Sequence, residues 1–187
     1  MRLNLPILDQ LADSQNILIA GAGGGFDVFS GLPLYFTLKA LGKNVHLANY
    51  IFSEFDLIKI VSEPQILADG LVLGPGGVIR YDLPYYPEGY LSQWFKQVRG
   101  EDVTVWMFAR TGAAPLAQGY AALVKHLDID ALILVDGGVD SIMRGDENGS
   151  GTMVEDSITL AAAQNIDIPV KILACIGFGT EIEEALC

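Results

Sequence analysis

The sequence predicts an α/β protein in which a mostly parallel β-sheet is covered by helices on both faces. Short apolar runs alternate with helix-length amphipathic stretches along the 187-residue chain, which is the pattern of βαβ units. Hydrophobic residues make up 51% of the chain, as expected when strands are buried on both faces. Glycine-bearing loops directly follow most of the apolar runs. We therefore expect a Rossmann-like three-layer sandwich.

Six apolar runs have the length and composition of buried strands. They are Asn16–Ala20, Asn44–Ala48, Gly70–Leu73, Val103–Phe108, Ala131–Val135 and Val170–Cys175. Four amphipathic stretches between these runs are predicted to be helices. They are Phe29–Leu41, Gly89–Val98, Pro115–Leu127 and Val154–Asn165. Pro115 suits a first helical turn, because proline lacks an N–H that this turn would leave unpaired.

The chain shows no internal repeat, linker or low-complexity segment, so we expect one α/β domain over residues 1–187. Residues 181–186 have the pattern of the opening turns of a helix, and no closing turn follows them. This ending raises the alternative that the domain lacks a C-terminal part.

The net charge of −12 argues against binding to a nucleic-acid backbone or an anionic membrane, because both need clustered Lys and Arg. Two cysteines, Cys175 and Cys187, are too few for a disulfide scaffold and indicate reduced thiols. The N-terminal residues have no continuous apolar stretch of the secretory kind. The most hydrophobic window, residues 17–41, contains Asp27 and Lys39 and is not expected to cross a membrane. These features predict a cytoplasmic protein.

Five of the six predicted strands are followed directly by loops that contain glycine, at residues 21–25, 74–77, 111–112, 137–138 and 177–179. In a parallel sheet such loops share the carboxyl edge, where open α/β sheets bind ligands. Glycine lets backbone amides approach a ligand, and a following helix adds its positive end, so a phosphate-containing small molecule is the expected ligand. The predicted backbone donors are Gly23, Gly24, Gly25, Gly76, Gly77, Gly137 and Gly138. The alternative is that these glycines serve tight turns alone.

The first glycine loop departs from the dinucleotide-binding pattern. Gly21 and Gly23 begin a G-x-G-x-x-G, but Phe26 stands at the third glycine position. The second strand ends at Ala48-Asn49 without the acidic residue that would hold a ribose. We therefore do not expect an NAD site. Asp27 follows the loop, where it is either a helix cap or a ligand for a metal or a substrate hydroxyl.

An acidic segment follows the fifth predicted strand. Its carboxylates are Asp136, Asp140, Asp146, Glu147, Glu155 and Asp156. Such groups repel one another unless they bind a cation, pair with Arg144 or point into water. We predict that Asp136, Asp140 and Asp146 hold a divalent cation, with Asp136 and Asp140 also as catalytic candidates. Oxygen ligands favour Mg²⁺ or Mn²⁺ over zinc. Arg144 would neutralise phosphate, and the alternative is a solvated acidic loop.

The segment Gly137-Gly138-Val139-Asp140-Ser141 is similar to the phosphate-binding SGGxDS loop of ATP pyrophosphatases. Here Asp136 replaces the leading serine, and the motif follows a late strand instead of the first one. This similarity places Ser141 among the ligand-binding candidates.

A broader resemblance rests on three segments: AGAGGGFDVFSGLPLYFTLKALG, LGPGGV and LVDGGVDSIMRGDENGSGTMVEDSI. With these segments the chain resembles the domain of unknown function 1152 family, from about residue 17 to residue 180. The resemblance implies a family of chiefly archaeal and bacterial proteins that are longer than this chain. It implies no catalytic residues.

The stretch RYDLPYYPEGYLSQWF, residues 80–95, is rich in aromatic side chains. They are Tyr81, Tyr85, Tyr86, Tyr90, Trp94 and Phe95. They are either a lid that stacks on a bound base or sugar, or a contact surface between subunits. The mean hydropathy of +0.37 favours the contact surface, so we expect a homo-oligomer. Two functions remain open: a binder or enzyme for a nucleotide or phosphorylated metabolite, and a non-catalytic sensor or assembly subunit.

Overall fold

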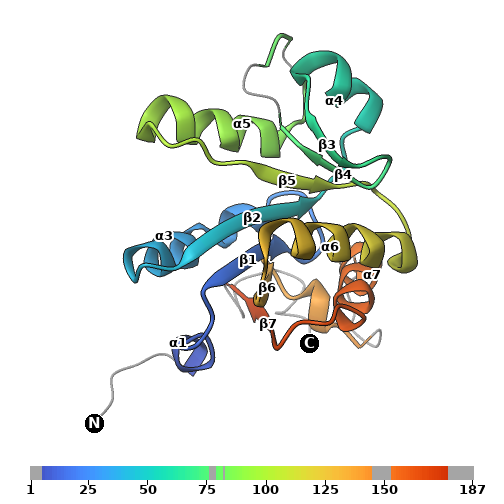
Figure 1. Ribbon diagram of the computed structural model, residues 1–187. Coiled ribbons are helices and arrows are strands. Elements are labelled where there is room, and N and C mark those ends of the chain that lie inside the picture. The colour runs from blue at the N-terminus through green and yellow to red at the C-terminus, as the bar shows by residue number, and fades with distance from the viewer. Residues whose placement is uncertain (1–5, 76–78, 82, 145–152, 177–187) are drawn as a thin grey trace.

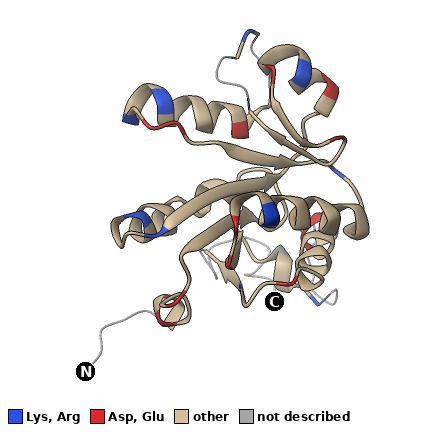
Figure 2. Ribbon diagram, viewed as in Figure 1, with Lys and Arg blue, Asp and Glu red and all other residues tan. Residues whose placement is uncertain are grey.

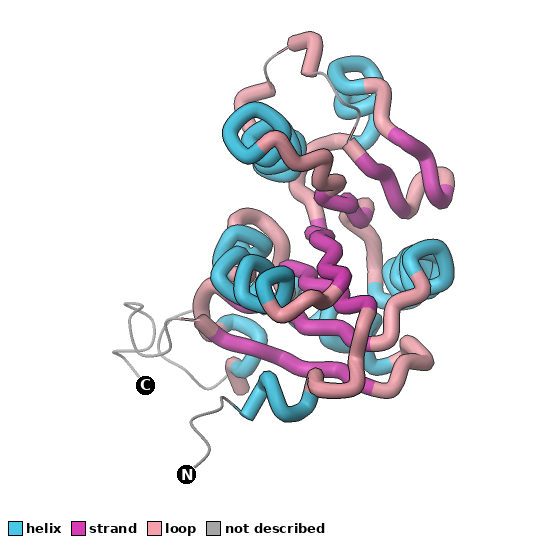
Figure 3. Tube along the Cα trace, turned by 60° about the vertical axis from the view of Figure 1, so that its left-hand side comes forward, coloured by secondary structure: helices cyan, strands magenta, loops and turns pink. Residues whose placement is uncertain are grey.

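The computed structural model describes residues 6–75, 79–81, 83–144 and 153–176. Within these residues the chain forms one seven-stranded sheet between two layers of helices, which confirms the expected Rossmann-like α/β fold (Figures 1 and 3). The strand order is β3-β4-β5-β2-β1-β6-β7. Strands β5, β2, β1, β6 and β7 run parallel, and β4 runs antiparallel to both β3 and β5.

The strands are β1 (Asn16–Gly21), β2 (Asn44–Tyr50), β3 (Gln65–Ala68), β4 (Val72–Gly74), β5 (Val105–Phe108), β6 (Ala131–Asp136) and β7 (Val170–Cys175). The α-helices are α1 (Pro6–Gln10), α2 (Asp27–Ser30), α3 (Leu32–Ala40), α4 (Phe55–Ser62), α5 (Pro87–Trp94), α6 (Ala113–Leu127) and α7 (Met153–Gln164). A π-helix, η1 (Phe95–Arg99), continues α5, and a 3₁₀ turn, η2 (Asp140–Ile142), follows β6.

The core lies on both faces of the sheet because successive side chains of a strand point to opposite faces. In β1, Ile17 and Ile19 pack toward α3 and α5, whereas Leu18 and Ala20 pack toward α6 and α7. All four side chains are fully buried. Strand β1 is therefore a central strand covered by helices on either side, and its loop opens between the two helical layers.

The predicted helix Phe29–Leu41 is two helices in the structure. They meet at Gly31, where an added Cβ would lie 2.6 Å from the Ile19 side chain, so only glycine lets the junction approach β1 this closely. The predicted helix Gly89–Val98 begins earlier, at Pro87, and changes to the π-helix η1 at Phe95. Helices α1 and α4 and strand β3 were not predicted, since each is short and lacks a long periodic pattern.

The predicted strand Gly70–Leu73 is shifted to β4 and is antiparallel to its neighbours. A link of three residues joins β3 to β4, which is too short for the crossover that a parallel pair needs. Gly74 therefore ends β4 beside Trp106, at the amino edge of the parallel strands, opposite to the expected carboxyl edge. Gly76 and Gly77 lie outside the described residues.

Among the described residues, every helix is too short or too polar to cross a lipid bilayer.

Candidate functional site

A crevice of about 340 Å³ lies at the carboxyl ends of β1 and β6. These two strands are neighbours in the sheet, but the chain leaves β1 toward β2 and leaves β6 toward β7, on opposite sides. Open α/β sheets bind ligands at such a topological switch point, because the diverging connections leave a gap between their loops. The loops after β1 and β6 supply most of the residues that line the crevice.

The glycine loop after β1 has a backbone that only glycine adopts easily. Gly24 and Gly25 have φ angles of 95° and 60°, in the left-handed region. A Cβ on Gly24 would also lie 2.3 Å from the carbonyl oxygen of Tyr50. No described residue accepts a hydrogen bond from the amides of Gly24 and Gly25, and both residues line the crevice. These two N–H groups are therefore backbone donors that a ligand could use.

Asp27 connects the two loops of the crevice. Its Oδ2 accepts a hydrogen bond from the amide of Gly23 at 2.9 Å, and its Oδ1 accepts one from the amide of Gly137 at 3.1 Å. Asp27 is the first residue of α2, whose N-cap is Phe26, so its carboxylate acts across the crevice and not as a helix cap. The amides of Gly23 and Gly137, expected to bind phosphate, therefore already donate to this carboxylate.

Asp136 ends β6 and is 2% exposed. A buried carboxylate needs hydrogen-bond donors, and the turn after β6 supplies them. The amide of Gly138 donates to Oδ1 at 2.7 Å, and the amide and hydroxyl of Ser141 donate to Oδ2. The Ser141 Oγ also lies 3.5 Å from the Sγ of Cys175. Ser141 thus holds Asp136 in place and does not line the crevice.

Asp156, on the first turn of α7, completes a cluster of carboxylates. One oxygen each of Asp27, Asp136 and Asp156 lies within 4.8 Å of the other two. Asp156 is 2% exposed and packs so closely on the first loop that a Cβ on Gly23 would lie 2.1 Å from its Oδ2. Three carboxylates from three segments have the spacing to share one Mg²⁺ or Mn²⁺ ion.

The remaining predicted site residues are placed as follows. Gly138 lines the crevice beside Asp136, and Arg144 is an exposed residue beyond η2. Asp140 begins η2, but its side chain lies outside the described part of the structure, as does Asp146. Figure 2 shows acidic positions along the ribbon in the segments around β6 and α7.

Asp156 belongs to the acidic segment, but its sequence pattern predicted no role for it in the site. Its distance along the chain from Asp27 hides their proximity, because α7 packs beside the β1 loop only in the folded chain. The available signal was its place in the first turn of a predicted helix that leads from one strand to the next.

Asn49 and Glu88 form a second buried pair under the glycine loop, also missed from sequence. The Asn49 amide donates to the carbonyl oxygen of Gly25 at 2.9 Å and to Glu88 Oε1 at 2.6 Å. Glu88 is 1% exposed, and its burial raises its pKa to about 7 although the Asn49 hydrogen bond opposes this shift. Asn49 Oδ1 and Glu88 Oε2 have no hydrogen-bond partner among the described residues.

The fold and the crevice define a class: a doubly wound α/β protein with carboxylates gathered at the switch point of its sheet. Within that class, residues 90–185 match the model of the family described as "Protein of unknown function (DUF1152)", which is a little over half of the chain. The chain belongs to this family, and the expected resemblance is confirmed. The matched region includes Asp136 and Asp156, but the glycine loop after β1 precedes it. No curated protein matches the chain.

Proposed function

We propose that the crevice between the ends of β1 and β6 binds a divalent cation together with the phosphate group of a small molecule. The observation that carries this proposal is the carboxylate cluster of Asp27, Asp136 and Asp156, whose oxygens lie within 4.8 Å of one another. Two of these groups are buried, and gathered negative charge is unfavourable at low dielectric unless positive charge offsets it. Mg²⁺ or Mn²⁺ would supply that charge.

The cation explains how an acidic crevice would accept a phosphate. No described Lys or Arg lines the crevice, so the cluster alone would repel an anion. A cation coordinated by the three carboxylates would keep open positions for phosphate oxygens, as Mg²⁺ does in many phosphate sites. The amides of Gly24 and Gly25, which lack acceptors among the described residues, would donate to the same phosphate.

The same arrangement suits chemistry at a phosphate. A cation at this position would polarise a phosphate oxygen and stabilise negative charge that develops there. Asp136 accepts three hydrogen bonds from the β6 turn, which fix both of its oxygens. We assign it to coordination and positioning, in preference to general-base catalysis.

The alternative function, a sensor or assembly subunit, uses the aromatic stretch of residues 80–95 as its contact surface. In the structure Tyr86 and Phe95 are buried in the core, whereas Tyr81 and Trp94 are exposed. The stretch therefore offers fewer aromatic side chains to a partner than its sequence suggests. A homo-oligomer stays a prediction, and no specific observation raises it above the ligand-binding proposal.

Calorimetric titration with Mn²⁺ tests the proposal directly. We expect the wild-type protein to bind Mn²⁺ and to gain thermal stability with it, since a ligand at about 100 times its Kd adds roughly 2.7 kcal/mol. Asp156→Asn should abolish both effects. Asp128→Asn, which makes the same charge change at the exposed end of α6, should preserve them.

Pyrophosphate provides the second arm of the test. Its binding should require Mn²⁺ or Mg²⁺ and should disappear with EDTA. Absence of Mn²⁺ binding in the wild-type protein, or equal binding by Asp156→Asn, would contradict the proposal.

A further inference from the structure

Three aromatic rings converge at the mouth of the crevice. Phe26 follows the glycine loop, Phe52 follows β2, and Tyr85 precedes α5. The ring centroids of Phe26 and Tyr85 are 5.9 Å apart, and those of Phe52 and Tyr85 are 6.5 Å apart. We call these three side chains the aromatic rim.

Two side chains of the aromatic rim are exposed, and the third, Phe52, is partly buried against the core. Phe26 is 63% exposed and Tyr85 is 37% exposed, although their neighbours Val28 and Tyr86 are buried in the core. Single apolar side chains are common on protein surfaces, but a group of contacting rings beside a polar crevice is typical of ligand sites. The rim therefore offers flat apolar surface next to the carboxylates.

The rim and the carboxylate cluster belong to one cavity. Phe26 and Phe52 line the crevice together with Asp27, Asp136 and Asp156. Tyr85 reaches the same place, because its hydroxyl would lie 3.4 Å from a Cβ on Gly25. Burial raises the pKa of the Tyr85 phenol, and the negative charges of Glu88 and Asp27 raise it further.

We infer that the ligand of this crevice is a nucleotide whose base packs against the aromatic rim, stacking on one ring and meeting the edge of another, while its phosphates approach the carboxylate-bound cation. This inference rests on the proposed function and narrows its ligand class. A ligand for this cavity needs a planar apolar part and an oxyanion part, and a nucleotide has both, whereas a sugar phosphate has no planar ring. The cavity volume of about 340 Å³ lies within the range of small-molecule sites.

The departure from the dinucleotide pattern supports the inference. Phe26 occupies the position of the third glycine in G-x-G-x-x-G, so the residue that breaks the pattern also supplies a ring of the rim. Asn49 stands where an acidic residue would hold a ribose, and its amide is already used by Gly25 and Glu88. The nucleotide would therefore be held through its base, which packs on the aromatic rim, in place of the usual contact between an acidic residue and the ribose.

The test compares nucleotides with base-free phosphates at a fixed Mg²⁺ concentration. Calorimetry would measure the Kd of ADP, ATP and GTP against those of pyrophosphate and tripolyphosphate. We expect the best nucleotide to bind at least about tenfold more tightly than the base-free ligand with the same number of phosphates, which is the usual scale of base stacking on aromatic side chains.

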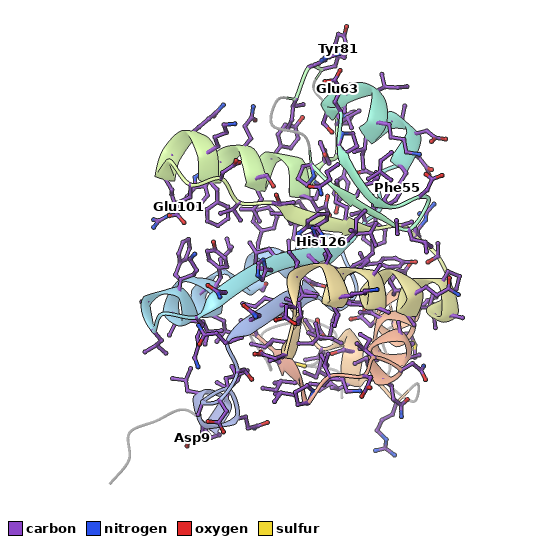
Figure 4. The ribbon with its side chains drawn as sticks, viewed as in Figure 1. Asp9, Phe55, Glu63, Tyr81, Glu101 and His126 are labelled. Atoms are coloured by element: carbon purple, nitrogen blue, oxygen red, sulfur yellow. The ribbon has the colours of Figure 1, made fainter. Side chains whose placement is uncertain are left out.

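Variants of the rim make the test specific. Phe26→Ala and Tyr85→Ala should remove the preference for nucleotides over the base-free phosphates, and Phe26→Trp should preserve it. Tyr81→Ala is the matched control, because Tyr81 is 67% exposed, lies beside α4 and does not line the crevice (Figure 4).

The outcomes separate the two proposals. If pyrophosphate and tripolyphosphate bind as tightly as the nucleotides, the stacking inference is wrong and the cation–phosphate site stands. If nucleotides are preferred but the rim variants keep that preference, the rim is not the base site and the inference is also overturned. If no phosphate compound and no Mn²⁺ binds, both proposals fall.

Discussion

The side-chain amide of Asn49 donates to Glu88 at 2.6 Å, inside the protein and directly under the glycine loop. Asn49 lies near the end of β2 and also donates a hydrogen bond to the carbonyl oxygen of Gly25. Glu88 belongs to the first turn of α5. The pair thus connects α5 to the loop that lines the crevice. Because one carboxyl oxygen of Glu88 has no partner among the described residues, the protonation state of this group affects the stability of the fold.

Glu88 should make the protein less stable as the pH rises from about 4.5 to about 7. Burial raises its pKa from 4.5 to about 7, so in this window the unfolded chain loses the proton while the folded protein keeps it. Above about pH 7 both states have lost the proton, and the decrease in the free energy of unfolding is complete. Glu88→Gln has no proton to lose, so its free energy of unfolding should not fall in this window. Relative to the wild type the variant should therefore gain at most about 3 kcal/mol between the two pH values. Urea unfolding at several pH values measures this difference, and a pH-independent difference would count against it.

Gly24 should tolerate alanine much less well than Gly42 does. Both have positive φ, but a Cβ on Gly24 would lie 2.3 Å from the Tyr50 carbonyl oxygen, whereas one on Gly42 would meet nothing within 4 Å. We expect Gly42→Ala to lower the free energy of unfolding by about 1 kcal/mol and Gly24→Ala by at least about 3 kcal/mol. Urea denaturation of both variants measures this. Equal losses would show that the loop relaxes around the new methyl group.

Gly23→Ala should weaken cation binding without changing any carboxylate. Its Cβ would lie 2.1 Å from Asp156 Oδ2, so the carboxylate of Asp156 must move away from Asp27 and Asp136. Gly112→Ala is the control, because Gly112 follows β5 and a Cβ there meets nothing within 4 Å. Calorimetric titration with Mn²⁺ should show at least about a tenfold rise in Kd for Gly23→Ala only. An unchanged Kd would place the cation elsewhere.

Tyr120→Phe should leave the protein as stable as the wild type or more stable. The hydroxyl of Tyr120 is fully buried and has no partner among the described residues, so its removal ends an uncompensated desolvation cost. Tyr50→Phe is the matched comparison, because the Tyr50 hydroxyl donates to the Thr111 carbonyl at 3.0 Å. Losing that bond should cost about 1 kcal/mol. Thermal unfolding distinguishes the two, and a destabilised Tyr120→Phe would reveal a partner for its hydroxyl.

The fold class and the parallel core of the sheet were predictable because each depends on local patterns. A buried parallel strand is an apolar run, and its helix is a periodic stretch, so residues 16–20, 131–135 and 170–175 were found close to their observed bounds. The glycine turns after β1 and β6 were predictable for the same reason. Their shared edge follows from the parallel direction of the two strands.

The local patterns could not determine which distant segments meet. The direction of β4 depends on its short link to β3, which reverses the chain and moves Gly74 to the opposite edge. Asp156 joins Asp27 and Asp136 only because α7 packs over the sheet beside the first loop, and Asn49 meets Glu88 only because α5 packs on the other side. The sequence by itself thus determined the parallel strands and the glycine turns after β1 and β6, through hydrophobic periodicity and backbone sterics. The tertiary structure alone decided the carboxylate cluster and the aromatic rim, because packing between residues far apart in the chain places those side chains together.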